Sequence, residues 1–319
     1  MSSSFRDLAL GSLVLIYLIL LGFLALGGPF PALVPLGSPT AYRNLYIHVP
    51  QSITALLAAA VATAAALMYL LKPSPRRFRL MDNAAVLAAV LSWLSFITGT
   101  VWAAESWGSA WSGDPRQLTV GVMAVLYTAY VILKRSVEDP DRLGRVAASY
   151  LVIAAASIPI TLAAPVLFPA LHPATGSALA ELPQAIRMWY LSALLLLLAA
   201  AVLHLAGCRI PKIFALAAFT VATIFGGYVL WQNAAPLYRV YNATLLNDVV
   251  VMHTDRGVLE VPRHKVSLNP LVINGTSALT GHLVTKEGEV VTHWSVGFNL
   301  LATGAAVMFI SLTRGRGRE

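Results

Sequence analysis

The chain of 319 residues carries 22 Lys and Arg against 14 Asp and Glu, for a net charge of +8, and its mean hydropathy is +0.73. Hydrophobic residues make up 58% and charged residues 11%, whereas a soluble domain has about 25% charged residues. These values exclude a soluble globular protein. The positive charge does not argue for a nucleic-acid partner, because cytoplasmic Lys and Arg loops of a membrane protein give the same excess.

A transmembrane helix needs about 20 apolar residues. Eight stretches qualify, in chain order 8–27, 47–71, 83–104, 118–133, 146–168, 187–206, 211–231 and 293–312. The first has a charged head but no small-residue cleavage site, so we expect a helix and not a removed signal peptide. Pro159 and Pro165 predict kinks in the fifth stretch. The single cysteine, Cys208, excludes an intramolecular disulfide.

Most basic residues of the connectors fall on one side of the predicted membrane. They are Arg6, Lys72, Arg76, Arg77, Arg79, Lys134, Arg135, Arg142, Arg145, Arg209, Lys212, Arg314, Arg316 and Arg318. The short connectors of the other side hold only Arg43, Arg116 and Arg187. The positive-inside rule therefore predicts that both termini are cytoplasmic.

The segment 232–292 is then extracytoplasmic. It is polar, and its β-type runs DVVVMH, VLEVP and EVVTHW are separated by turn signals. We expect a small β-rich domain that is marginal on its own and packs on the membrane part. Two N-x-[ST] tripeptides, at Asn242 and Asn274, are either glycosylation sites or chance occurrences.

The connector after the third stretch holds three tryptophans within ten residues: Trp102, Trp107 and Trp111. One interpretation is an interfacial aromatic belt, since Trp favours the headgroup depth of a bilayer. The glycines and serines between the rings would also let a planar ligand stack on them, with Glu105, Asp114 and Arg116 as polar contacts at its rim. The spacing alone leaves both interpretations open.

Two histidines share that predicted outer side. His48 stands where the second stretch begins, and His172 lies in the loop between the fifth and sixth. A lone interfacial histidine more often caps a helix end, but neutral imidazole is also a standard axial ligand of haem iron. Arg43 and Arg116 could pair with the haem propionates. Zinc would need three or four closely grouped ligands, so the pattern fits haem better.

Other candidate sites are weaker. His204, near the cytoplasmic end of the sixth stretch, has no evident partner. Four further histidines lie in or beside 232–292, where solvated side chains are the ordinary case: His253, His264, His282 and His293. No GxSxG, HExxH or P-loop sequence is present. Asp82 and Glu181 are expected at span edges or in loops, which argues against an ion-coupled transporter.

Four segments occur in an order and spacing that match a known family: RNLYIHVP, WGSAWSGDPR, KRSVEDPDRLGRVAASYLVIAAASIPI and LHPATG. Over about residues 40–206 the chain resembles the CcmC-type haem-handling proteins of cytochrome c maturation, which belong to a wider group with a Trp-rich WWD loop. The resemblance implies non-covalently bound haem b, with His48 and His172 as iron ligands on the extracytoplasmic side of the plasma membrane. By position, the other implied contacts are Trp107, Gly108, Trp111 and Asp114 in the loop, and Arg43 and Arg116 at the propionates.

The same resemblance implies partners: haem, a membrane-anchored haem chaperone of the CcmE type, subunits of an ABC-type transporter, and apocytochrome c as a further candidate. Gly113 departs from the family loop, W-G-x-x-W-x-W-D, where a Trp precedes the Asp. One stacking face is missing there, and Trp102 is the candidate to cover that part of the ring. The run WAAESWGS and the DP pair look more like the CcsA-type haem lyases of the group.

We therefore predict an all-α polytopic membrane protein with three parts: a haem-handling core of seven helices at 1–231, a β-rich domain at 232–292, and a final span with a basic tail at 293–319. CcmC-type chains end after six spans, so the last two spans have no counterpart. A haem delivery protein without catalysis is the leading hypothesis. A cytochrome c haem lyase is the alternative. Such lyases generally have a second histidine pair within the membrane, and this chain offers only His204 there, which argues against the alternative. A quinol or small-molecule permease ranks last.

Overall fold

The computed structural model describes residues 3–34, 38–172, 182–234, 236–266, 272–273, 275–291 and 294–313. Within these ranges, eight segments are long and apolar enough to cross a membrane. They are Ser4–Gly27, Pro39–Leu71, Pro75–Ser106, Pro115–Ser136, Arg142–Leu167, Gln184–Leu205, Lys212–Ala234 and Trp294–Thr313. The eight predicted spans are confirmed as helical segments of this kind, and the protein is a multi-pass membrane protein.

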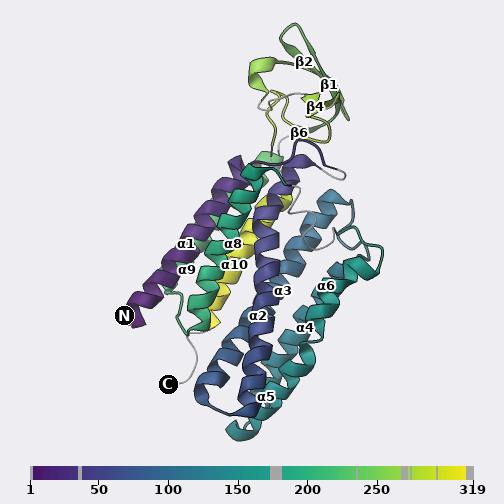
Figure 1. The fold of residues 1–319 in the computed structure, drawn as a ribbon. Helices are drawn as coiled ribbons and strands as arrows, with labels where there is room; N and C mark the ends of the chain where they lie inside the picture. The colour runs from purple at the N-terminus through teal and green to yellow at the C-terminus, as the bar shows by residue number, and fades with distance from the viewer. Residues whose placement is uncertain are drawn as a thin grey trace.

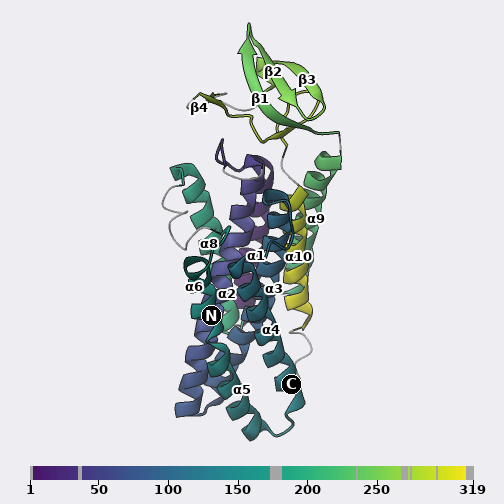
Figure 2. The same cartoon turned by 90° about the vertical axis from the view of Figure 1, so that its right-hand side faces the viewer.

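The helices form one elongated bundle (Figures 1 and 2). Their bounds are α1 Ser3–Gly27, α2 Leu45–Leu71, α3 Pro75–Ser106, α4 Pro115–Ser136, α5 Pro140–Ala154, α6 Ser157–Leu167, α8 Gln184–Leu205, α9 Lys212–Ala234 and α10 Trp294–Thr313, and a 3₁₀ turn, η1 Pro39–Asn44, leads into α2. In Figure 1, α2 and α3 run through the centre, with α4, α5 and α6 on one side and α1, α8, α9 and α10 on the other.

Small residues bring the two central helices together. The buried alanines of α2 and α3 include Ala55, Ala58, Ala59, Ala62, Ala65, Ala66, Ala84, Ala85, Ala88 and Ala89. Lipid tails are as apolar as these side chains, so helices in a membrane associate through close backbone packing, which small residues permit. This contact fixes the start of α2 against the end of α3, where the candidate site residues lie.

The fifth span is broken, as its prolines predict. α5 ends at Ala154 and α6 begins at Ser157. Pro159 has no N–H to donate to the carbonyl of Ala155, and that carbonyl instead accepts from the N–H of Ile158 at 3.0 Å. The turn between the two helices changes the direction of the chain, and His172, which follows α6, lies beside Trp107 at the end of α3.

The strands lie beyond one end of the bundle, and α1 begins and α10 ends toward the other (Figure 1). A four-stranded antiparallel sheet has the order β3-β2-β1-β6 and is built from β1 (Tyr238–Leu246), β2 (Val249–Thr254), β3 (Gly257–Pro262) and β6 (Leu283–Val284). A second sheet pairs β4 (Val272–Ile273) with β5 (Thr276–Ser277). We call residues 238–291 the strand unit.

Two of the three predicted β-type runs, DVVVMH and VLEVP, form β2 and β3. In the third, EVVTHW, residues 289–291 form no strand and Val290 makes a single bridge to Val284. Residues 292–293 fall outside the described residues, and Trp294 begins α10. Trp294 is helical because it begins a long apolar segment, whose backbone N–H and C=O groups must bond to one another in lipid. Of the two tripeptides, Asn242 lies exposed on β1, whereas Asn274 falls outside the described residues.

The strand unit rests on the connector that follows α1. The ring of His282 is fully buried, and its centroid lies 5.3 Å from that of the Phe30 ring. The Arg43 guanidinium lies over the Phe30 ring, 4.8 Å from its centroid. Burial lowers the pKa of His282 to about 4. A hydrogen bond to the backbone of Ala32 opposes this shift, and the charge of Arg43 adds to it. The imidazole is therefore neutral at pH 7.

Candidate functional site

The first turns of α2 position His48. Its Nδ1 lies 2.9 Å from the hydroxyl of Thr98 on α3. The Thr98 hydroxyl has one proton, which it donates to the carbonyl of Leu94 at 2.7 Å, so it must accept from the Nδ1–H of His48. The Ser52 hydroxyl is 3.5 Å from Nε2 and makes shorter bonds elsewhere. The geometry thus leaves a lone pair on His48 Nε2.

Two neighbours confine the His48 ring. A Cβ added to Gly99 would lie 2.7 Å from His48 Cε1, so the ring packs directly on the bare backbone of α3. Trp102, one turn further along α3, meets the ring edge to face at 5.9 Å and 70°, and meets Tyr42 at 5.8 Å. The Trp102 Nε1 is buried and has no hydrogen-bond partner among the described residues.

Asp114 positions His172. The Nδ1 of His172 lies 2.7 Å from Asp114 Oδ1, and the backbone N–H groups of Leu171 and His172 donate to Oδ2 at 2.7 and 3.1 Å. Asp114 is also the N-cap of α4, accepting from the N–H groups of Arg116 and Gln117. One carboxylate therefore fixes both the start of α4 and the segment that follows α6.

Burial favours a neutral His172 imidazole beside an ionised Asp114 carboxylate. Burial acts to raise the pKa of Asp114, but the charge and hydrogen bonds of His172 and the N–H of Leu171 outweigh it and lower the pKa below its ordinary value. Burial lowers the pKa of His172, and Asp114 only partly opposes this. With its proton on Nδ1, the neutral ring also carries its lone pair on Nε2.

The loop after α3 completes the surroundings of His172. Trp107 caps the end of α3, and its ring meets the His172 ring edge to face at 5.0 Å and 85°. His48, His172 and Arg116 lie within electrostatic reach of one another. The structure thus brings together two histidines from distant parts of the chain, each against a tryptophan, with an arginine nearby.

Other predicted site residues lie apart from the histidines. Trp111 is 53% exposed and packs against Phe96 at 6.3 Å. Arg43 is buried and donates to the carbonyls of Gly28 at 2.7 Å and Ala25 at 3.2 Å, at the end of α1. Asp114 lies behind His172 and not at a rim, because five hydrogen bonds surround its carboxylate.

The two loop glycines have a backbone reason. Gly108 and Gly113 adopt φ of +75° and +72°, a region that side chains other than those of Gly, Asn and Asp rarely enter. The CcmC-type loop has a Trp at the position of Gly113. The positive φ of Gly113 is a backbone conformation that a bulky residue rarely adopts. Trp102, the candidate to cover the face that this Trp would cover, lies beside His48.

The acidic residues also lie deeper than expected. Asp82 lies within α3, where it accepts from Tyr130 and forms an ion pair with Lys134 at 2.8 Å. Glu105, in the last turn of α3, is buried and accepts a hydrogen bond from Ser295 of α10. The sequence interpretation missed this contact, as it missed Thr98 and Gly99. The signal for these two was present in the sequence, because they are neighbouring small and polar residues inside an apolar span.

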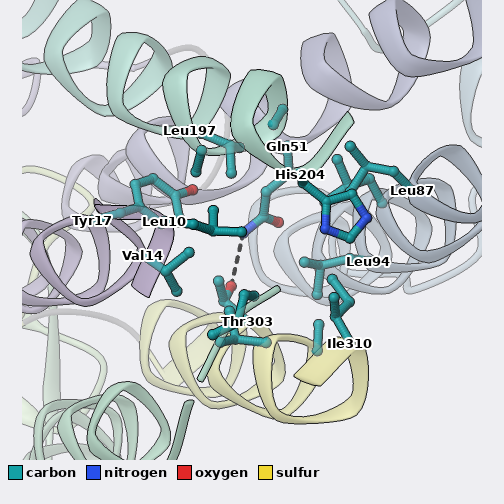
Figure 3. A pocket seen from close by; sticks show the side chains of 16 residues that line it. Leu10, Val14, Tyr17, Gln51, Leu87, Leu94, Leu197, His204, Thr303 and Ile310 are labelled. Carbon is teal, nitrogen blue, oxygen red and sulfur yellow. Dashed lines mark hydrogen bonds between the residues drawn. The ribbon is translucent and has the colours of Figure 1, made fainter. Parts of the chain in front are cut away.

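His204 lines a separate cavity inside the bundle. The cavity holds about 60 Å³ and is almost entirely apolar, with Tyr17, Gln51 and Thr303 as its other polar lining residues (Figure 3). Pockets for drug-sized ligands occupy about 300–1,000 Å³, whereas one water takes about 30 Å³ of liquid volume. The space fits about two waters and not a macrocycle.

Sequence comparisons match the residues that build this site. The family described as Heme exporter protein C (CcmC) matches residues 12–219, more than half of the chain. The chain belongs to the CcmC family. Similar curated proteins are the Heme exporter protein C of Bradyrhizobium diazoefficiens, 30% identical over 118 residues (37% of this chain and 45% of that protein), and that of Escherichia coli K12, 30% identical over 128 residues (38% and 49%). That of Paracoccus denitrificans is 28% identical over 99 residues (31% and 41%).

The CcmC match has a clear boundary in the fold. The chain spans about half the length or less of the curated relatives it matches. Residues 12–219 include both histidines, the Trp-rich loop and Asp114, and they end inside α9. The strand unit and α10 lie outside the matched CcmC region.

Proposed function

We propose that this chain is a haem-binding protein of cytochrome c maturation that holds haem b non-covalently between His48 and His172. The observation that carries the proposal is that both imidazoles donate through Nδ1 to a fixed acceptor and so present Nε2. Metal-bound histidines typically make such a bond through their other ring nitrogen, because it sets the tautomer and the ring orientation. The two histidines also lie within electrostatic reach of one another.

The surrounding side chains suit a haem. Two tryptophan rings flank the histidines and offer apolar walls, and the buried N–H of Trp102 is a donor in need of an acceptor. Arg116 is a cation within electrostatic reach of both histidines and would pair with a propionate. Asp114 contributes through His172. Arg43, Trp111 and Gly108 are proposed as haem contacts on the family resemblance alone, because Arg43 bonds to the end of α1 and Trp111 packs on Phe96. Haem iron would supply the two coordination positions that the imidazoles fill.

The location follows from the charges. The Lys and Arg residues of the connectors gather on the side away from the strand unit, so the positive-inside rule puts the histidines and the strand unit outside the plasma membrane and both termini inside. At that surface, haem would be delivered to a membrane-anchored haem chaperone of the CcmE type, with an ABC-type transporter driving its release. A haem lyase activity has less support, because its second haem would require more space than the cavity beside His204.

The test is haem binding by the whole protein in lipid nanodiscs. Wild-type protein from haem-replete cells should show a Soret band and a low-spin spectrum, because two imidazoles ligate the iron. His48→Ala and His172→Ala should each lose the low-spin spectrum. The matched control is His264→Ala, an exposed histidine of the strand unit, which should keep it. Wild-type protein without a Soret band, or a low-spin spectrum that survives both substitutions, would overturn the proposal.

Co-expression with an apocytochrome c distinguishes haem delivery from covalent haem attachment. The chain alone should leave the CxxCH thiols free, since it acts as a carrier. Covalent attachment of haem to the apocytochrome, read from the mass of the product, would establish the lyase alternative instead.

A further inference from the structure

The last helix, α10, presents a line of polar side chains to the inside of the bundle. Ser295, Asn299 and Thr303 are spaced by four residues, so they lie on one helix face, and each is at most 3% exposed. We call these three residues the polar face of α10. Polar groups buried in a membrane bundle are costly unless they are bonded, so their partners indicate what the face is for.

The partners come from the helices that carry His48 and its support. Ser295 accepts from Asn44 Nδ2 at 2.6 Å and donates to Glu105. Thr303 accepts from Gln51 Nε2 at 2.8 Å, at the edge of the cavity in Figure 3. The polar face of α10 thus runs along α2 and α3 beneath the site.

Asn299 makes the contacts nearest to His48. Its Nδ2 donates to Asn44 Oδ1 at 2.8 Å and to the backbone carbonyl of Thr98 at 2.9 Å. Asn44 is the residue before α2, one turn from His48, and Thr98 is the residue whose hydroxyl accepts from His48 Nδ1. One amide group therefore ties together the two segments that orient the His48 ring.

We infer that Asn299 is a positioning residue for His48, so that α10, which lies outside the matched family region, is a working part of the haem site. The inference rests on the proposed function. Without the amide, α3 could shift against the start of α2. Thr98 and Gly99 would then no longer hold the ring with Nε2 toward the iron.

The experiment compares two substitutions on the same helix face. Asn299→Leu removes both bonds and keeps the number and branching of the side-chain heavy atoms. Thr303→Val, one turn further along, removes the bond from Gln51 and the bond to the backbone carbonyl of Asn299, and it leaves both bonds of the Asn299 amide in place. Outer hydrogen-bond partners of metal ligands contribute about 10- to 100-fold to affinity. Titration of nanodisc-embedded apoprotein with ferric haem should therefore give a Kd raised about tenfold in Asn299→Leu and unchanged in Thr303→Val, both proteins melting as a single folded species.

The spectrum of the bound haem gives the readout that a structural role would not change. Asn299→Leu should show altered low-spin electron paramagnetic resonance values, and Thr98→Val should show the same change, because both act through His48. Their effects on the logarithm of Kd should be less than additive in the double variant.

Wild-type affinity and spectrum in Asn299→Leu, equal effects of Asn299→Leu and Thr303→Val, or strict additivity with Thr98→Val would each overturn the inference. These outcomes are distinct from failure of the proposed function. If the proposed function fails, wild-type protein takes up no haem, or His48→Ala binds haem as tightly as wild type does.

Discussion

The two histidines of the site are held in opposite ways. His48 belongs to a long helix packed on its neighbours through alanines, and a neutral hydroxyl sets its tautomer. His172 follows a short helix at the end of a broken span, and a carboxylate with five hydrogen bonds holds both its ring and its backbone. One proposed iron ligand is therefore positioned by the bundle, whereas the other depends on a single residue, Asp114.

The strongest test of this comparison is Asp114→Ala. It removes the contacts of His172 together with the N-cap of α4, which alone costs about 1 kcal/mol. We expect haem affinity to fall about 100-fold, the upper end for such partners, against about tenfold for Thr98→Val on the His48 side. Haem titration in nanodiscs measures both. Equal losses from the two substitutions would show that the two histidines depend on their partners to the same degree.

A smaller effect is expected from crowding the rigid side. In Gly99→Ala the new Cβ would lie 2.7 Å from His48 Cε1, so the ring must move, and we expect about a tenfold loss of haem affinity. Gly227→Ala on α9 is the matched control, because it makes the same helical substitution with no atom within 4 Å. Both gain about 1 kcal/mol of helix propensity. Haem affinity that is unchanged in Gly99→Ala would mean that the ring has room to adjust.

The smallest expected effect is a shift in pH dependence on the His172 side. Only the neutral imidazole binds iron, and burial holds the pKa of His172 below its ordinary value, so wild-type protein should release haem only as pH falls below about 6.5. Asp114 raises that pKa. Asp114→Asn also weakens binding at pH 7, so the two proteins are compared at haem concentrations that give equal saturation at that pH, and the acid release of the variant should then lie at lower pH. Soret absorbance against pH measures the shift, and a shift to higher pH would contradict it.

A pH effect of the same kind applies to the strand unit. The pKa of His282 is about 4 when folded and about 6.5 when unfolded, so the unfolded state binds more protons between these values. Stability is then lost as pH falls from 6.5 to 4, by about 3 kcal/mol at most. Amide hydrogen exchange of β1 and β2 at pH 7 and 4.5 should show this loss in wild type, and His282→Leu should show much less.

Much of the fold follows from the sequence because lipid imposes simple requirements. A span must be apolar over its whole length, so all eight were found, and Pro159 announced the break before α6. The strands DVVVMH and VLEVP followed from their β-branched residues. EVVTHW failed because its last residue belongs to the apolar run of α10.

The site was predictable only in its outline. His48, His172 and the tryptophans were singled out by their place at one end of the spans, but their partners depend on which helix faces meet. The roles of Asp114 behind His172 and of Thr98 behind His48 required the packing of α3, α4 and α6. Arg43 was predicted at a propionate, and its bonds to the end of α1 come from a connector whose path the sequence does not specify.

The close crossing of α9 and α10 has a consequence for the strand unit as a polymer. A Cβ on Gly226 or Gly297 would lie 2.7 Å from the carbonyl oxygen of the other, so the two backbones touch. The intervening segment, from Ala234 to Trp294, thus has its ends held together even when it is unfolded. Closing a loop of that length removes entropy from the unfolded chain worth on the order of 3–4 kcal/mol. The membrane hairpin therefore acts as a cross-link that stabilises a domain too small to be secure alone.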